Sequence, residues 1–276
     1  MSIITLTTDF GYKDHFVGAI KGTIYNELED AKIVDISHKI SPFNIQECAY
    51  ILKNSYHAFP KGTIHIVGVD AEPTVENQHL AVYVDGHYFI LANNGVSTLI
   101  TAEIKPDNVV ELQIPNPHPG PFPMMEIFVK VACHIARGGK LEVVGKKFTK
   151  LKELKEFAPR ITNNGDTLVG SVIYIDNYGN VITNIQKSLF EAYRKGRNFE
   201  LLARNKKITQ IVNKYSEIIN FDLEKNQRKG PGDLLALFNS SGYIELAIYK
   251  SDLNTVGGAS SLLGLDYRDT VTINFK

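Results

Sequence analysis

The stretch IHIVGVDAEPTVENQHLAV, residues 64–82, contains a short apolar strand that stops at one aspartate. Such a β-branched run is typical of a strand buried inside a parallel sheet, and its members are Ile64, Ile66, Val67 and Val69. Asp70 ends the run, and the apolar pattern resumes at Leu80. Taken alone, Asp70 is either a turn residue or a carboxylate at the end of a strand, where α/β proteins bind ligands.

Strand-like and helix-like patterns alternate on both sides of this stretch. We predict strands at 3–7, 32–36, 64–69, 80–84, 87–91 and 109–113, and helices at 16–28, 44–56, 94–103 and 125–137. Asp85-Gly86 predicts a hairpin turn between two of the strands. This alternation favours an α/β layered domain with a largely parallel sheet.

The pattern changes near residue 160, where the chain becomes rich in short strands separated by Gly, Asn or Asp. We predict these strands at 167–176, 180–184, 198–203, 207–211, 233–238, 243–248 and 270–275. With little helix among them, they favour a small β-barrel or sandwich. The sequence therefore predicts an N-terminal α/β domain over 1–160 and a C-terminal all-β, barrel-like domain over 161–276.

Composition excludes several classes of protein. Among 276 residues, Lys+Arg and Asp+Glu are both 30, so net charge favours neither nucleic acid nor an acidic membrane surface as a partner. No apolar run approaches the roughly 20 residues of a membrane helix. Cys48 and Cys133 lie far apart, and the eight histidines have no ligand spacing, so neither a disulfide framework nor a metal site is indicated. We expect a cytoplasmic protein.

TTDFGYKDHFVGAIKG, residues 7–22, places Asp9 at the end of the first predicted strand. A carboxylate there is well placed to bind sugar hydroxyls, although Asp9 is also a common turn residue. For Asp14 we favour the role of a cap for the following helix.

VIYIDNYGNVITNI, residues 172–185, gives a second candidate site. Asn-Tyr-Gly-Asn is a good hairpin turn in its own right. Asp176, Tyr178 and Asn180 also offer a carboxylate, an aromatic ring and an amide to a polar planar ligand. The segments 239–247 and 257–265 are further polar turns of the β-rich half.

Taken in order, eight segments resemble the family of S-adenosyl-L-methionine (SAM) hydrolases, also called SAM hydroxide adenosyltransferases, which includes fluorinases and chlorinases. They are TLTTDFGYKDHFVGAIKG, IVDISHKISPFNIQECAYIL, the Val69-Asp70 loop, HYFILANNG, FVKVACHIARGG, VIYIDNYGNVITNI, NSSGYIELA and GGASSLLGL. The hydrolase branch is nearer, because the halogenases lack an aspartate at the position of Asp70. A carboxylate there would also repel a halide.

The resemblance implies the two-domain architecture and a homotrimer with sites between subunits. It implies that SAM is attacked by water at ribose C5′, giving adenosine and methionine, with no cofactor or metal. Asp9 would hold the ribose hydroxyls and Phe43 would pack on the ligand, with Asn94 in the same ligand-binding set. The methionine and adenine ends would be held by Asp176, Tyr178, Asn180 and Ser240.

The chain departs from this family where water is activated. Asp70 matches the catalytic aspartate, but the expected arginine is Asn77, and the expected histidine is Pro123. An amide supplies no fixed positive charge and proline exchanges no proton. Candidate replacements are His118, Glu72, His79 and Glu126. The sequence therefore leaves two functions open: a SAM hydrolase with impaired activity, or a non-catalytic sensor or scaffold that binds SAM or adenosine.

Overall fold

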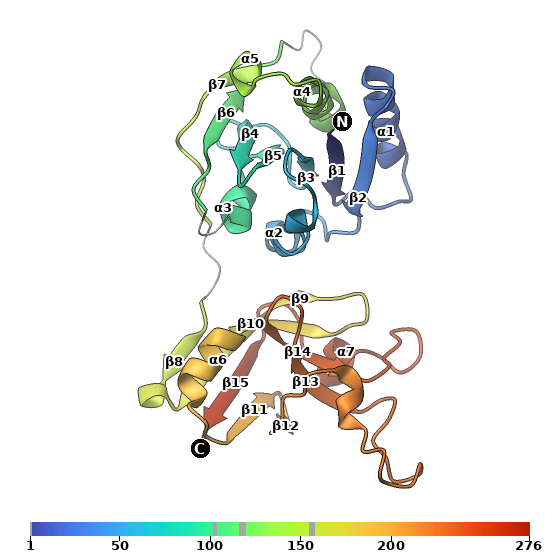
Figure 1. Cartoon of the computed structure of the whole chain (residues 1–276), viewed down its shortest axis with the longest axis vertical. Helices are drawn as coiled ribbons and strands as arrows, with labels where there is room; N and C mark the ends of the chain where they lie inside the picture. The colour runs from blue at the N-terminus through green and yellow to red at the C-terminus, as the bar shows by residue number, and fades with distance from the viewer. Residues whose placement is uncertain (1, 102–103, 116–119, 155–157) are drawn as a thin grey trace. The chain divides into compact units, whose positions relative to one another are not determined.

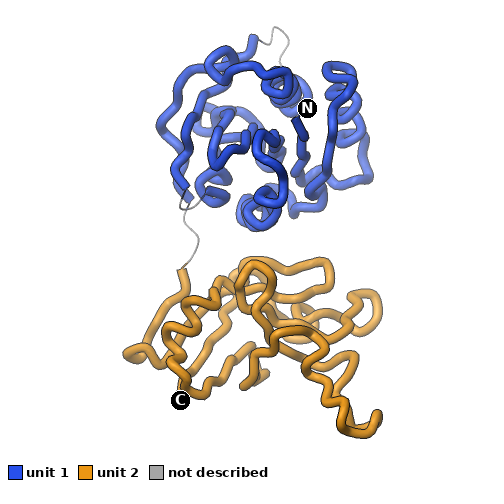
Figure 2. Tube along the Cα trace, viewed as in Figure 1, with its two compact units in different colours: residues 1–156 blue, residues 157–276 orange. Residues whose placement is uncertain are grey.

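The computed structural model describes residues 2–101, 104–115, 120–154 and 158–276, and it divides into two compact units (Figures 1 and 2). Unit 1 comprises residues 1–156 and unit 2 residues 157–276. The sequence prediction places the boundary at 160. In the described part of the chain, no helix is long and apolar enough to cross a membrane.

Unit 1 contains a seven-stranded sheet in the order β2-β1-β3-β5-β4-β6-β7. The strands are β1 (Ile3–Thr8), β2 (Lys32–Ser37), β3 (Ile64–Gly68), β4 (His79–Val84), β5 (His87–Ala92), β6 (Asn108–Leu112) and β7 (Gly145–Lys147). The first four in spatial order are parallel, as predicted, and the pairs β5-β4, β4-β6 and β6-β7 are antiparallel. The antiparallel half begins at the predicted hairpin, where Asp85 and Gly86 both have positive φ.

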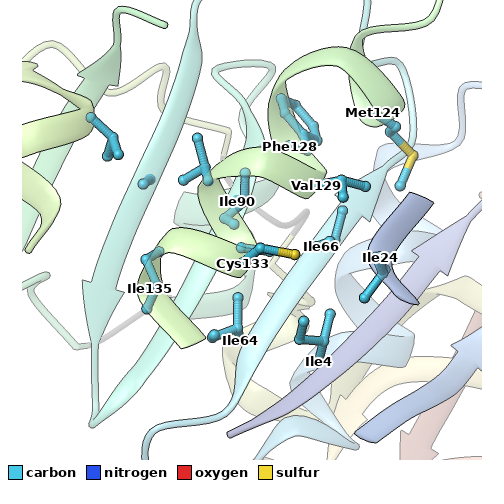
Figure 3. Packing of buried hydrophobic residues seen from close by; sticks show 14 of the residues in the cluster. Ile4, Ile24, Ile64, Ile66, Ile90, Met124, Phe128, Val129, Cys133 and Ile135 are labelled. Atoms are coloured by element: carbon cyan, nitrogen blue, oxygen red, sulfur yellow. The ribbon is translucent and has the colours of Figure 1, made fainter. Parts of the chain in front are cut away.

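Helices cover both faces of this sheet (Figure 1). They are α1 (Phe16–Glu27), α2 (Ile45–Lys53), η1 (Tyr56–Ala58), α3 (Val96–Thr101), the π-helical η2 (Met124–Phe128), α4 (Val129–Ala136) and α5 (Leu141–Val144). One apolar core joins α1, η2 and α4 to the sheet, and a second joins α2 and α3 to it. Figure 3 shows Val129 and Cys133 of α4 packed against Ile64 and Ile66 of β3. The predicted α/β layering is confirmed.

Unit 2 is an antiparallel, barrel-like sheet of eight strands in the order β12-β11-β15-β9-β10-β14-β13, with β8 paired to β9. The strands are β8 (Arg160–Thr162), β9 (Thr167–Ile175), β10 (Val181–Gln186), β11 (Phe199–Ala203), β12 (Lys206–Ile208), β13 (Leu234–Phe238), β14 (Tyr243–Ile248) and β15 (Thr270–Phe275). The short helices are η3 (Asn163–Gly165), α6 (Lys187–Arg194), η4 (Tyr215–Ile218) and α7 (Ala259–Leu263). The predicted β-rich second domain is confirmed.

Helix α6 was not predicted from the sequence. Only one turn of this helix is deeply buried: Phe190 packs edge-on against Phe199 in the barrel core. Leu189 and Tyr193 pack against the same core, so one face of the helix is apolar. The helix has only eight residues, so its apolar face covers barely two turns, and a repeat this short is easily overlooked among strands.

A buried histidine pair links β1, β3 and β5 inside unit 1. The Nδ1 atom of His65 lies 2.7 Å from the Thr5 hydroxyl, and its Nε2 lies 3.2 Å from Nδ1 of His87. Burial, together with the neighbouring His87, lowers the pKa of His65 to about 3. His65 is therefore neutral in the folded protein at neutral pH, whereas in the unfolded chain its pKa returns to about 6.5.

This difference predicts acid sensitivity of the fold. Below pH 6.5 the unfolded chain binds a proton at His65 that the folded chain does not bind until about pH 3. Stability is therefore lost as pH falls from 6.5 towards 3, by up to about 1.4 kcal/mol per pH unit for this group. Urea unfolding at pH 7 and pH 5 should show a smaller loss for His65→Gln than for the unsubstituted chain. His15→Gln, at an exposed position, is the control, and equal losses in all three proteins would contradict the prediction.

Candidate active site

Two predicted site residues of unit 1, Asp9 and Asp70, follow neighbouring parallel strands. β1 and β3 pair with Thr8 opposite Gly68, so the backbone leaves both strands at the same edge of the sheet, where their carboxyl ends lie. Burial raises the pKa of Asp9, hydrogen bonds from the backbone lower it, and the nearby Asp70 charge raises it further. The structure thus brings the two carboxylates within electrostatic range, at the edge where open α/β sheets bind ligands.

Phe43 lies beside Asp9 and is bonded to it through the backbone. Its N–H donates to Oδ2 of Asp9 at 2.9 Å, and its φ is 61°, a left-handed conformation that costs energy for an aromatic residue. Its side chain is 73% exposed. A bulky ring held in a strained conformation and left open to solvent offers a stacking surface next to the Asp9 carboxylate.

Asp70 also adopts a left-handed conformation, with φ 47°, and Asn94 holds it there. The Asn94 amide nitrogen donates to the carbonyls of Val69 and Asp70 at 3.0 and 3.1 Å. Its oxygen accepts from the backbone N–H of Val96 at 3.0 Å. Both ends of this buried amide are therefore engaged within the protein, where Asn94 fixes the turn that carries Asp70. Direct contact of Asn94 with a ligand stays a prediction.

Asn77, which stands where the resemblance expects an arginine, turns towards the same loop. Its amide nitrogen donates to the carbonyls of Asp70 and Glu72 at 3.2 and 2.9 Å. The Nε2–H of His79 donates to the carbonyl of Ala71 at 2.9 Å. Burial lowers the pKa of His79, so this imidazole is a neutral structural donor at pH 7. The loop after β3 is therefore held by hydrogen bonds from side chains to its backbone carbonyls.

The other proposed replacements for the missing base differ in their environments. Glu126 accepts a hydrogen bond from the backbone N–H of Gly120 at 2.8 Å, and Glu72 is exposed. His118 lies outside the described residues. Pro123 precedes the π-helical turn η2 as its N-terminal cap residue, and Met124 of that turn packs on Gly68, where any side chain would collide with its sulfur. The η2 segment thus lies against the end of β3.

A partly buried polar chain of four side chains, not predicted from the sequence, ends next to Asp9. Lys21 Nζ lies 2.6 Å from Oδ2 of Asp35, whose Oδ1 lies 3.2 Å from Nε2 of His38. Nδ1 of His38 lies 2.7 Å from the Thr8 hydroxyl. Burial raises the pKa of Asp35, but the contacts with Lys21 and His38 outweigh it, so the pKa is lowered and Asp35 is charged.

The function of this polar chain follows from where it ends. Thr8 directly precedes Asp9, and the carbonyl of His38 accepts from the N–H of Gly11 at 2.6 Å. Thr8 and His38 are fully buried, so the threonine hydroxyl is not available as a nucleophile. This polar chain of side chains therefore fixes the Asp9–Gly11 turn. No short sequence motif signals it, because its members come from β1, α1, β2 and the loop after β2.

In unit 2, Asp176 organises the turn between β9 and β10. Its Oδ1 accepts from the backbone N–H groups of Tyr178 and Asn180 at 2.8 and 2.9 Å, and its Oδ2 accepts from the Asn180 amide at 2.9 Å. Tyr178 is 62% exposed. Within the described residues, the buried Oδ1 of Asn180 has no hydrogen-bond partner. This turn therefore has an exposed aromatic ring and a buried amide oxygen that has no partner among the described residues.

Ser240 lies at the exposed tip of the turn between β13 and β14. In the antiparallel pair β10-β14, Val181 is opposite Leu246 and Gln186 is opposite Tyr243. The Ser240 turn and the Asp176 turn are consequently at opposite ends of this pair. The polar segment 257–265 lies against the Asp176 turn instead, since the N–H of Ser260 donates to the carbonyl of Gly179 at 2.9 Å.

Comparisons with known proteins identify the family. The model of the SAM hydroxide adenosyltransferase N-terminal domain matches residues 4–145, and that of the C-terminal domain matches residues 170–272. An (R)-S-adenosyl-L-methionine hydrolase of Methanocaldococcus jannaschii is 30% identical, over 99% of this chain and 96% of its own. A fluorinase of Actinopolyspora mzabensis is 26% identical, over 89% of this chain and 90% of its own.

The fold comparison agrees. The crystal structure of an uncharacterized conserved protein from Thermotoga maritima superposes with a TM-score of 0.83 at 27% identity, covering 99% of this chain and 100% of that one. A conserved hypothetical protein from Thermus thermophilus has the same fold, with a TM-score of 0.71 at 20% identity over the whole of both chains. The resemblance found in the sequence is confirmed: the chain belongs to the SAM hydroxide adenosyltransferase family.

Proposed function

We propose that the chain is a cytoplasmic SAM hydrolase that forms adenosine and methionine without a metal or cofactor. The observation that carries this proposal is the pairing of Asp9 and Asp70 at one sheet edge, with the Phe43 ring exposed beside them. SAM carries a sulfonium cation, which two carboxylates attract. Carboxylate oxygens also suit the two ribose hydroxyls, and an exposed ring suits a flat base.

In the proposed reaction a water oxygen attacks C5′ of the ribose from the side opposite the sulfonium. The new C–O bond forms as the C–S bond breaks, and its electron pair stays on sulfur, which leaves as the neutral thioether of methionine. The water loses one proton to the Asp70 carboxylate and then to solvent. Because the leaving group needs no acid, the work of the protein is to align and desolvate the reactants and to orient water. Negative charge at Asp70 disfavours a halide as nucleophile.

A second function is favoured by the position of Asn77. Its amide is bonded to the backbone of the Asp70 loop, so this position contributes neither the positive charge nor the proton exchange that a hydrolytic constellation would use. The chain would then bind SAM or adenosine as a sensor or scaffold without turning SAM over.

Incubation with SAM in H₂¹⁸O separates the two functions. A hydrolase releases equal amounts of adenosine and methionine, and the adenosine carries one ¹⁸O at its 5′-hydroxyl because water attacks C5′. Mass spectrometry of the products measures this, and EDTA should leave the rate unchanged. Tight calorimetric binding of SAM with no adenosine above a heat-killed control would instead support the sensor or scaffold function. Absence of both binding and turnover would refute both functions.

Replacing Asp70 by Asn tests its catalytic role. The amide keeps the shape of the side chain but accepts no proton from water, so we expect kcat for SAM to fall about 100-fold or more. The Kd for SAM should change by only a few-fold, because Asp9 and Phe43 remain. Asp222→Asn, at an exposed position of unit 2, is the matched control and should behave like the unsubstituted chain. Unchanged turnover in Asp70→Asn would remove Asp70 from the mechanism.

The proposal also includes a homotrimer whose sites are formed between subunits. Unit 1 of one copy and unit 2 of another would then contribute to each site, and a single copy would be inactive. Light scattering after size exclusion should give three times the chain mass of 30.8 kDa. On dilution, specific activity should fall together with the trimer fraction. A fully active monomer would contradict this part of the proposal.

A further inference from the structure

Glu245 is a buried carboxylate in unit 2 that the proposed reaction does not use. It lies on β14 and is 4% exposed. Across the sheet it is opposite Ile182 of β10 on one side and Leu237 of β13 on the other. Ile182 follows the Asp176 turn by a few residues, and Leu237 precedes the Ser240 turn. Glu245 therefore lies between the two turns that carry the predicted ligand-binding residues of this unit.

The partners of Glu245 connect it to one of these turns. The Tyr215 hydroxyl donates to Oε1 of Glu245 at 2.6 Å, and the Asn239 side chain is also hydrogen-bonded to the carboxylate. The Asn239 side-chain oxygen accepts from the backbone N–H groups of Ser241 and Tyr243 at 3.0 and 3.1 Å. The Ser240 turn is thus held through Asn239 by a buried carboxylate, an arrangement stable only when the carboxylate is well bonded.

The electrostatic surroundings connect Glu245 to the other turn. Burial raises the pKa of Glu245 and so does the charge of Asp176, while the bonds from Tyr215 and Asn239 lower it. Burial also raises the pKa of Tyr215. The hydrogen bond to Glu245 and the charges of Glu245, Asp176 and Tyr178 raise it further. The groups that face Glu245 are therefore neutral donors and one further carboxylate. This region of unit 2 concentrates negative charge around the Asp176 turn.

We propose that Tyr215, Glu245 and Asn239 form a positioning network that makes unit 2 selective for a ligand bearing a positively charged amino group. The inference rests on the proposed function: the cation is then the α-ammonium group of SAM, and the neutral product adenosine lacks it. The network acts in two ways. It holds the Ser240 turn through Asn239, and it adds a second negative charge near Asp176. Tyr215 belongs to the connection between β12 and β13, which thereby becomes part of the binding site.

Affinities for SAM and for adenosine, measured side by side, test this network. SAM affinity is taken as KM where the chain turns SAM over and as Kd from calorimetry where it does not; adenosine affinity is Kd. For Glu245→Gln we expect SAM affinity to fall about tenfold, adenosine affinity to change less than twofold, and kcat to be unchanged. Glu200→Gln, which removes a carboxylate of β11 that is paired with lysines, is the matched control and should change neither affinity.

Tyr215→Phe supplies a second, independent variant. Loss of its hydroxyl removes a bond that lowers the pKa of Glu245, so this pKa rises further and the carboxylate is protonated at a higher pH. The acidic limb of the SAM affinity profile should therefore move to higher pH, while the adenosine affinity profile stays the same as in the unsubstituted chain. If circular dichroism shows that Glu245→Gln is unfolded, the pH profile of SAM affinity in Tyr215→Phe tests the network on its own.

The outcomes separate this inference from the proposed function. Equal losses for SAM and adenosine, or no loss for SAM, overturn the network while leaving the function standing. If the unsubstituted chain binds neither ligand, the proposed function fails and the network fails with it.

Discussion

The parallel pairing of β1 with β3 is the constraint on which the site in unit 1 depends. With Thr8 opposite Gly68, the two strands deliver Asp9 and Asp70 to one edge. The charge of Asp70 raises the pKa of Asp9, so the two carboxylates repel each other and the strand register has to hold them near one another. Both strands are buried on both faces, so a shift of register would exchange the side chains packed into the two apolar cores of this unit. The apolar run before Asp70 is therefore what places the carboxylate.

The turns that follow these strands are held by neutral donors and by one ion pair. Asn94 and Asn77 donate to the carbonyls around Asp70, and the chain from Lys21 through His38 ends at Thr8. A left-handed φ at a non-glycine residue costs about 1–3 kcal/mol, and a few hydrogen bonds of about 1 kcal/mol each offset it. These hydrogen bonds hold the backbone of the Asp70 turn and leave the Asp70 side chain out of the bonding. The residues that hold these turns are therefore different from Asp9, Asp70 and Phe43, which are proposed to bind the ligand.

The sequence was sufficient for what depends on local pattern and insufficient for what depends on distant contacts. Strand and helix periodicity predicted the layered first unit, and Asp85-Gly86 predicted its hairpin. Asp9 and Asp70 could be placed at one edge because strand ends of a parallel sheet coincide. No local pattern predicts that Asn94 is hydrogen-bonded to the carbonyl of Asp70, or Glu245 to the hydroxyl of Tyr215. These partners are 24 and 30 residues apart in the sequence. Nor could it predict that the Asp176 and Ser240 turns lie at opposite ends of β10 and β14.

Asn77 shows why binding and turnover make different demands on the same loop. Binding a sulfonium ribose needs negative charge, hydroxyl partners and a ring, and in the proposed function Asp9, Asp70 and Phe43 supply these without any cation. Turnover additionally needs water, whose pKa of about 15.7 makes it a poor nucleophile unless a group orients it or takes its proton. A sulfonium leaves readily, so orientation alone contributes a large part of the acceleration. In the proposed mechanism, the hydrolytic rate therefore depends on the backbone turn that carries Asp70, which Asn94 and Asn77 hold through the Asp70 carbonyl.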